Sequence, residues 1–222
     1  LNPTENFTMI MASSLNEIGT LKVILNLYSS SHLFKVNGEE ILGSLVLTFV
    51  SELCTIDQVA TKFITNGLFA TLLESPLSVA IQEGNIKPEQ NASLHSIWSN
   101  GLLSIILLLL SKFGTKVLPE CCLFLSYFSQ QVETAVFRWS DSRLAVSTAL
   151  IRESTQLVLL QKILHSLNYQ QYLTNSNVIS SSREDHIEIE LVVGLDSDRE
   201  RKALSVALNR LLTHPKYLNS RI

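Results

Sequence analysis

Two adjacent cysteines, Cys121 and Cys122, are the residues of this sequence best suited by type and spacing to covalent chemistry. A neighbouring pair of thiols can act as a redox couple. Both lie in the segment LPECCLFLSYF, however, which is apolar on all sides and is typical of inert core cysteines. With Cys54 the total is odd and shows no framework spacing, so we expect reduced, buried thiols in an intracellular protein.

The histidines and acidic residues do not follow the spacing of a metal site or of an acid–base pair. The acidic pairs fall at expected helix starts or in a loop, where negative charge suits the helix dipole. The sequence contains no HExxH, CxxC or GxSxG motif and no strand-linked glycine-rich phosphate loop. We therefore expect no catalytic residue, no metal and no cofactor, and a protein that is not an enzyme. The histidines, which we expect at the surface or at helix ends, are His32, His95, His165, His186 and His214.

The charges argue against direct nucleic-acid binding. Residues 1–100 hold four lysines against nine acidic residues, and residues 101–222 hold thirteen basic against eleven acidic ones. Neither half is basic enough for an electrostatic footprint on nucleic acid, and the basic residues are not interleaved with aromatic ones.

The segment GLLSIILLLLSKFG, residues 101–114, is the most apolar part of the chain. A helix needs about 20 predominantly apolar residues to span a bilayer, and this run is shorter. The next segment, 117–128, is also apolar on every face but contains Pro119 and Glu120. We expect two buried helices at the centre of a helical stack, not a transmembrane span, with an interfacial or re-entrant hairpin as the alternative.

Helical periodicity recurs along the whole sequence. In 38–54 apolar pairs repeat every four residues, and stripes of the same kind cover 155–167 and 201–212. Glycine and proline fall between these stripes, where helices end or begin. The predicted helices are 4–18, 20–33, 39–54, 56–66, 68–75, 76–83, 90–113, 116–128, 130–139, 142–167 and 197–213.

Capping patterns and polar stretches give the predicted boundaries. Thr55 with Gln58, and Ser197 with Glu200, match the capping box, and Ser140-Asp141 can cap the helix beginning near Ser142. The predicted loops are 84–89 and the Ser/Asn-rich 174–186, which we expect to be mobile. The stretch 186–194 alternates like a strand, but a lone strand lacks a partner, so we predict a short helix there.

Helices that end every 15–20 residues pair into units of 35–45 residues, the size of HEAT and armadillo repeats. We therefore predict an all-α fold, an α-solenoid of stacked antiparallel helix pairs, as a single segment over 1–222. An irregular helical bundle is the alternative that periodicity leaves open. The chain lacks an initiator methionine and opens in mid-pattern, so we expect a fragment of a larger chain.

Three stretches carry a resemblance to a known family: SIWSNGLLSIILLLLSKFGTKVLPECCLFLSYFSQQ (96–131), WSDSRLAVSTALIRESTQLVLLQKIL (139–164) and ELVVGLDSDRERKALSVALNRLLTHPKYLNSRI (190–222). Together they resemble the C-terminal tail of a fungal inner-ring scaffold nucleoporin, the smaller of two related, very large α-solenoid nucleoporins. The resemblance covers at least the second half of the chain.

The resemblance implies a structural component of the nuclear pore complex at the nuclear envelope. Its partners would be other nucleoporins, both linker and inner-ring components, with transport receptors as further partners, and it would support nucleocytoplasmic transport. It implies no catalytic residues. A soluble HEAT-type transport receptor or adaptor is the alternative, and a membrane-surface helical protein is a third reading, restricted to the hairpin 97–128.

A solenoid binds partner segments through apolar and aromatic side chains at helix ends and loops. Trp139 is the strongest candidate because it follows Arg138 at a predicted helix boundary, and we expect Trp139→Ala to weaken partner binding. For each candidate, ordinary packing between helices is the alternative. The candidate partner-binding residues are Trp98, Phe137, Trp139, Tyr169, Tyr172 and Tyr217.

Overall fold

The structure, a computed structural model, describes residues 3–17, 19–139, 147–169, 171–172, 202 and 205–206. Short connections join its α-helices, and single 3₁₀ or π turns extend some of them. The α-helices are α1 (Pro3–Glu17), α2 (Thr20–Ser30), α3 (Ile41–Leu53), α4 (Asp57–Thr65), α5 (Leu68–Glu74), α6 (Pro76–Gln82), α7 (Ala92–Ser96), α8 (Leu103–Phe113), α9 (Leu118–Tyr127), α10 (Ser129–Trp139) and α11 (Thr148–Ser166). The turns are the 3₁₀ helices η1 (Ser31–Leu33) and η3 (Gly114–Lys116) and the π-helix η2 (Ile97–Leu102).

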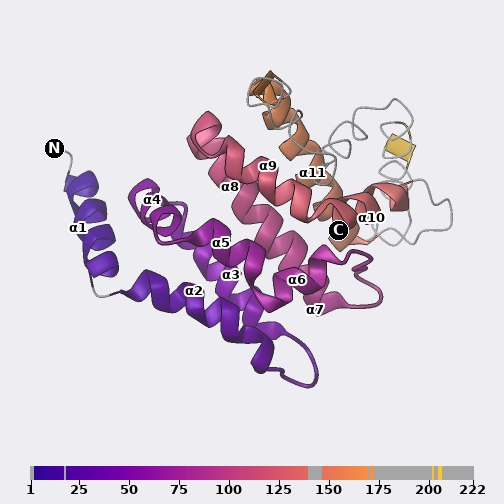
Figure 1. Cartoon of the computed structure of the whole chain (residues 1–222), viewed down its shortest axis with the longest axis horizontal. Coiled ribbons are helices and arrows are strands. Elements are labelled where there is room, and N and C mark those ends of the chain that lie inside the picture. The colour runs from indigo at the N-terminus through magenta and orange to yellow at the C-terminus, as the bar shows by residue number, and fades with distance from the viewer. Residues whose placement is uncertain are drawn as a thin grey trace, which may run out of the picture.

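The helices stack in successive layers from α1 to α11 (Figure 1). In one row, α2 packs against α5, and α5 packs against α9. In the other row, α3 packs against η2 and α8, and α8 packs against α11. Among the described residues, strand-type pairing is limited to one isolated bridge between Val36 and Glu39. The predicted all-α solenoid is confirmed.

The helix predicted over 90–113 is built from α7, η2 and α8 in direct succession. The side chain of Asn91 caps its start by accepting a 3.1 Å hydrogen bond from the amide of Leu94. Periodicity at 3.6 residues per turn did not reveal the π turn, which inserts extra backbone into the helix. Within that turn Gly101 lies directly against Leu47 of α3, which places the two backbones close together.

The consecutive apolar segments α8 and α9 lie in the core as predicted. Leu103, Ile105, Ile106 and Leu109 of α8 are at most 1% exposed, and the side chains of α9 that face α5 and α8 are buried with them. Among the described residues, one helix, Ala92–Lys116, is long and apolar enough to cross a membrane by length and composition, and 67% of its most apolar window is buried inside the molecule.

Some predicted helix ends differ from those observed. Thr55 does not cap α4: its hydroxyl donates back to the carbonyl of Glu52 at 2.6 Å, and the helix begins at Asp57 without a side-chain cap. The last long helix begins at Thr148 instead of near Ser142. There the hydroxyl of Ser147 accepts a hydrogen bond from the amide of Leu150, so the capping signal lies seven residues further along than Ser140. The predictions for 174–186 and 186–194, the Ser197 cap and most of helix 197–213 lie outside the described residues.

Candidate partner-binding surface

The three thiols are buried and free, which fits the inert core cysteines expected from the sequence. Burial raises the pKa of Cys54 from 9.0 to about 12 and that of Cys122 to about 11. For Cys121 burial raises the pKa further, and the neighbouring Cys122 and Glu120 add to the shift. All three sulfurs are therefore protonated at neutral pH, and a protonated, enclosed thiol is a poor nucleophile.

A buried polar cluster joins α11 to the helix α7–η2. Nε1 of Trp98 donates to Oε1 of Glu153 at 2.7 Å, and Nε2 of His95 lies 3.2 Å from Oε2 of the same carboxylate. The second contact has the distance of an ion pair but not the alignment of a hydrogen bond. The side chains of His95 and Glu153 are at most 2% exposed, so the cluster is enclosed and acts in packing. His95, expected at the surface or a helix end, lies at the end of α7 but is buried.

In the acidic pair Glu39-Glu40, the carboxylate of Glu40 also makes contacts that hold the fold together. Glu40 precedes α3, and its carboxylate accepts from Lys35 Nζ at 2.7 Å and from the hydroxyl of Ser93 at 2.7 Å. Partial burial works against the charge of Glu40, but the hydrogen bonds from Lys35 and Ser93 outweigh it and lower the pKa of this carboxyl. The contacts tie the loop before α3 to the first turn of α7. Among the described residues, no group of three or more His, Cys, Asp or Glu side chains is placed to hold a metal ion.

One side of α10 is held by contacts with the loop 84–89. The amide side chain of Gln131, itself buried, accepts from the backbone N–H of Ile86 and donates to its carbonyl, both at 2.9 Å. Arg138 Nη2 donates to Glu89 at 2.8 Å, and the amide of Asn85 donates to the hydroxyl of Thr134 at 3.0 Å. These contacts fix which face of α10 is turned inward.

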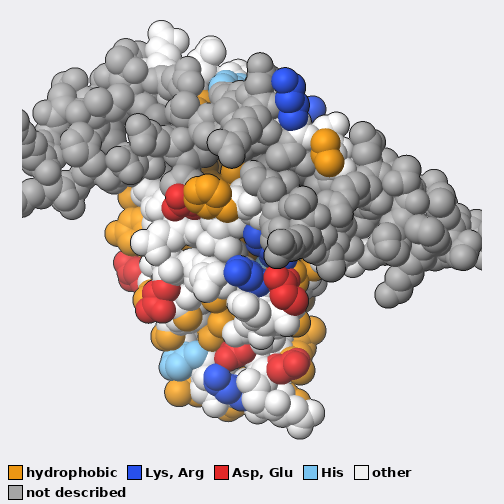
Figure 2. Space-filling view, turned by 90° about the vertical axis from the view of Figure 1, so that its right-hand side faces the viewer, with side chains coloured by type: hydrophobic (Ala, Val, Ile, Leu, Met, Phe, Trp, Pro, Cys, Tyr) orange, Lys and Arg blue, Asp and Glu red, His pale blue; other side chains and the backbone are white. Residues whose placement is uncertain are grey.

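Phe137 lies on the side of α10 away from the buried Val132 and Ala135 and is 67% exposed. A phenyl ring on a helix fixed in this way can enter an apolar pocket of a partner with little loss of conformational freedom. Figure 2 faces this end of the molecule. Over its described surface, acidic, basic and apolar side chains are interspersed, without a broad field of one sign.

The structure separates the sequence-predicted contact residues into groups. Trp98 and Tyr169 are at most 1% exposed, so their place is in the core and not on a binding surface: Trp98 stacks on Phe128, and Tyr169 meets His165 edge to face. Tyr172 is half-buried, and Phe137 is exposed. The side chain of Trp139, and Tyr217, lie outside the described residues.

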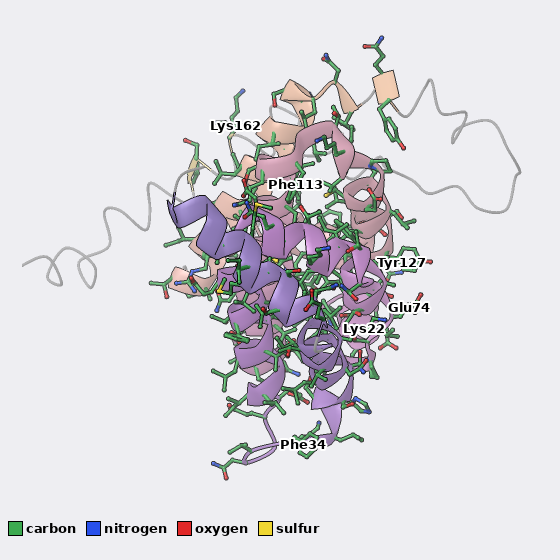
Figure 3. All side chains as sticks on the ribbon, turned by 90° about the vertical axis from the view of Figure 1, so that its left-hand side faces the viewer. Lys22, Phe34, Glu74, Phe113, Tyr127 and Lys162 are labelled. Atoms are coloured by element: carbon green, nitrogen blue, oxygen red, sulfur yellow. The ribbon has the colours of Figure 1, made fainter. Side chains whose placement is uncertain are left out.

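Exposed apolar residues on α2, on α3 and in the connection between them were not among the predicted partner-binding residues. Leu33, Phe34 and Val36, in the connection between α2 and α3, are each more than half exposed. Figure 3 shows Phe34 at the lower tip of the molecule, at the opposite end from Lys162. Further exposed apolar residues lie on α2 and α3 themselves. The sequence held a signal for them, because the apolar pairs of 38–54 form a stripe too wide for a single buried face.

The helices stacked in successive layers define the protein as an α-solenoid. The family model described as the nuclear pore protein NUP188 C-terminal domain matches residues 2–222, so the chain belongs to this family.

Two curated relatives and one solved structure agree with this family. The chain is 60% identical to nucleoporin NUP188 of Saccharomyces cerevisiae over 222 residues, which are 100% of this chain and 13% of the relative. It is 26% identical to nucleoporin nup184 of Schizosaccharomyces pombe over 156 residues, or 70% of this chain and 10% of that protein. A Nup188 fragment from Myceliophthora thermophila has the same fold, with a TM-score of 0.67 and 24% identity over 77% of this chain and 52% of the fragment. The chain thus spans a small part of the length of the curated relatives it matches.

Proposed function

We propose that this chain is a structural scaffold module of the nuclear pore complex, positioned in its inner ring at the nuclear envelope. The observation that carries the proposal is the family match across residues 2–222, together with the 60% identity to a nucleoporin. The layered solenoid supports it, because stacked helices offer long surfaces for other proteins. No enzymatic role is proposed, since the reactive side chains described above are enclosed.

The partners we propose are other nucleoporins, namely linker and inner-ring components, with transport receptors as further partners. Phe137 is the described residue best placed to contact them, with Tyr172 as a second candidate, and Trp139 and Tyr217 remain proposals from the sequence. The mixed charge of the described surface in the view of Figure 2 supports a protein partner over a nucleic acid, whose binding requires a basic stripe. The apolar helix 92–116 is proposed to serve in the core and not as a transmembrane segment, because most of it is buried.

The alternative function, a soluble transport receptor, is separated from the scaffold role by mobility. The test is live imaging of the full-length protein that contains this region, fluorescently tagged at its own locus, with photobleaching recovery. A punctate nuclear rim that recovers over many minutes is the expected result. A diffuse signal, or a rim that recovers within seconds, would overturn the scaffold role and favour the receptor.

A further inference from the structure

The connection between α2 and α3, residues 31–40, carries three large apolar side chains that face water. Leu33, Phe34 and Val36 are 70%, 55% and 53% exposed. Among the described residues, the other exposed large apolar side chains lie in α-helices, so this connection differs from the rest. Surface connections that a rigid scaffold positions are where binding residues concentrate. We refer to these three residues as the tip.

The backbone beside the tip is folded into a tight turn. Val36 and Glu39 exchange two backbone hydrogen bonds, each from the amide of one residue to the carbonyl of the other, at 3.0 Å. Between them Asn37 and Gly38 have φ angles of 54° and 85°, and a type I′ turn requires positive φ at both of its central residues. Asparagine and glycine are the residue types that adopt this conformation most readily. The turn therefore holds Val36 in a defined position.

Side chains brace the base of the same connection. The hydroxyl of Ser31 donates to the carbonyl of Tyr28 at 2.6 Å, which ties the start of the connection to the end of α2. At the other end, Lys35 Nζ lies 2.7 Å from a carboxylate oxygen of Glu40, and the second oxygen of Glu40 accepts from the hydroxyl of Ser93 at 2.7 Å. The connection is thus joined to two helices and to a second layer of the stack.

The tip projects from the edge of the stack. The backbone of Phe34 is extended, with φ −113° and ψ 93°, and successive side chains of an extended chain point to opposite sides. Because Lys35 turns back to Glu40, Phe34 and Val36 lie on the side away from it. Figure 3 looks along the direction in which the layers of Figure 1 follow one another, and it shows Phe34 at the lower extreme of the molecule. The tip therefore points across the stacking direction.

The charge beside the tip indicates what kind of surface would receive it. Lys35 is paired with Glu40, whereas the exposed Glu39 forms no ion pair among the described residues. An unpaired carboxylate therefore lies next to the apolar side chains. The surface of a cytoplasmic membrane leaflet is anionic and attracts basic segments, so this charge does not suit insertion into lipid. It suits a protein surface with basic side chains.

We propose that the tip docks into an apolar pocket on another protein, and that lysine or arginine side chains border this pocket and pair with Glu39. Apolar side chains on a braced connection enter a pocket with little loss of conformational freedom. Three side chains cover much less than the roughly 800 Å² that each partner buries in a standard interface, so the tip is an anchor within a larger contact. The proposal concerns a site separate from Phe137. It does not depend on the scaffold role, so imaging that overturned that role would leave it standing.

The first test is photocrosslinking in the cell. A benzophenone analogue of phenylalanine replaces Phe34 in the full-length protein that contains this region, expressed from its own locus. We expect one dominant adduct on another protein, mapped by mass spectrometry to an apolar pocket with lysine or arginine beside it. The matched control carries the same analogue at Val79, which is 45% exposed on α6, and should leave that pocket unlabelled.

The second test measures the affinity of the full-length protein for the purified protein that the analogue labels. Phe34→Ala/Val36→Ala should raise the Kd at least tenfold, because it removes two of the three apolar side chains. Glu39→Lys should raise the Kd at least fivefold at low salt and less at high salt, because solvent ions screen the repulsion from the basic border. Glu74→Lys reverses an exposed charge on α5 and is the control, with an unchanged Kd. The circular dichroism spectrum should be the same for all variants.

Four outcomes would overturn the proposal. An adduct confined to the protein's own chain would mean that the tip packs within the longer fold. An adduct on lipid, or binding to phosphatidylcholine–phosphatidylserine vesicles that Phe34→Ala/Val36→Ala abolishes, would identify a bilayer as the occupant. A normal nuclear rim without any adduct would mean that the tip stays in water. An unchanged Kd for Phe34→Ala/Val36→Ala or for Glu39→Lys would exclude the apolar anchor or the basic border.

Discussion

The indole Nε1 of Trp98 donates a 2.7 Å hydrogen bond to Oε1 of Glu153, and both residues are 0% exposed. The bond joins η2 to α11 across 55 residues of sequence. Next to this bond, Arg152 donates to Asn100 at 2.6 Å and Gln156 donates to Ser104 at 2.7 Å. This line of polar contacts fixes the position of α11 along η2 and α8. In a low-dielectric interior, each member of such a network depends on the others remaining paired.

Glu153→Ala should therefore be strongly destabilising. It removes the acceptor of the Trp98 N–H and the acidic partner of His95, and breaking a buried pair of this kind costs about 3–5 kcal/mol. Trp98→Phe keeps much of the ring stacking but leaves the carboxylate without its indole donor, and we expect a smaller loss of about 1.5–3 kcal/mol. Urea unfolding with unchanged m-values measures both effects.

The matched control is Arg152→Ala, because Arg152 is the exposed neighbour of Glu153 on the same helix and its polar contact lies at the surface. It should cost less than about 1 kcal/mol. If Glu153→Ala lowers the free energy of unfolding no more than Arg152→Ala does, the buried cluster does not stabilise the packing of α11.

Trp98 illustrates which part of the site the sequence could not predict. Its flanking residues are compatible with either a surface aromatic or a core aromatic. What decides between them is Glu153 on a distant helix together with Phe124 and Phe128, which stack with the indole. These contacts are tertiary, and local periodicity carries no information about them. The exposure of Phe137 was predictable, because Val132, Ala135 and Val136 form an apolar stripe on α10 and Phe137 lies outside it.

The helices themselves were largely predictable from apolar spacing, because a stripe at the helical period must be buried. The errors in the predicted boundaries lie at the helix ends, where one side chain can form alternative hydrogen bonds. The hydroxyl of Thr55 can cap the following helix or bond back to the preceding turn, and in the structure it bonds back to Glu52. Sequence alone does not rank these alternatives, which differ by roughly 1 kcal/mol.

Gly101→Ala should destabilise the protein although alanine favours helix. A Cβ at Gly101 would stand 2.5 Å from Cδ1 and 2.9 Å from Cβ of Leu47, and the second atom is too near the backbone to move aside. Overpacking costs about 1–3 kcal/mol, which outweighs the gain of at most about 1 kcal/mol in helix propensity. Thermal or urea unfolding measures the difference.

Gly43→Ala provides the comparison for Gly101→Ala. A Cβ at Gly43 would stand 2.7 Å from Cδ1 of Leu77 and 3.1 Å from both Cδ1 of Ile97 and Oγ of Ser31. The shortest of these contacts is to the far end of a flexible side chain, so we expect a smaller loss of stability. Leu47→Ala removes Cδ1 and Cγ but keeps Cβ, so in the double variant it should relieve part of the loss caused by Gly101→Ala. Additive losses in that cycle would rule out a clash with Cδ1 and Cγ of Leu47.

The buried thiols should resist modification in the native protein. Their raised pKa values, about 12 for Cys54 and about 11 for Cys122, leave almost no thiolate at pH 8, and burial blocks the reagent. With a chromogenic disulfide reagent at pH 8 we expect no fast phase in buffer and three equivalents of released chromophore in denaturant. A fast-reacting thiol in buffer would show that one cysteine is exposed and activated, contrary to the structure.

Phe137→Ala should weaken partner binding without changing stability. The ring is mostly in water in the free chain, so its loss leaves the free energy of unfolding within about 0.5 kcal/mol of the parent. If the ring anchors a partner, its removal should raise the Kd of a linker nucleoporin fragment about fivefold or more, the effect of losing over 1 kcal/mol of binding energy. Val79→Ala, an exposed apolar residue on another helix, is the control, and equal affinities for both variants would exclude Phe137 as an anchor.

Glu40 should make a pH-dependent contribution to stability. Its pKa is lowered from the ordinary 4.5 in the folded protein, so the folded state favours the ionised carboxylate. A lowered folded pKa gives stability that is fully present above the unfolded pKa and is lost as the pH falls through the folded one. Glu40→Gln should therefore reduce the free energy of unfolding by a constant amount at pH 7 and pH 5.5, and the deficit should shrink below pH 4.

The deficit should be modest, about 1 kcal/mol or less, because the Lys35 side chain is 53% exposed and solvent screens the pair. Added salt should reduce it further. Urea unfolding of the parent and Glu40→Gln at pH 7, 5.5, 4 and 3 measures it, with the exposed neighbour Glu39→Gln as the control. A deficit that grew on acidification would have the wrong sign for an ionised Glu40 held by Lys35 and Ser93, and would show that the folded protein prefers the protonated acid.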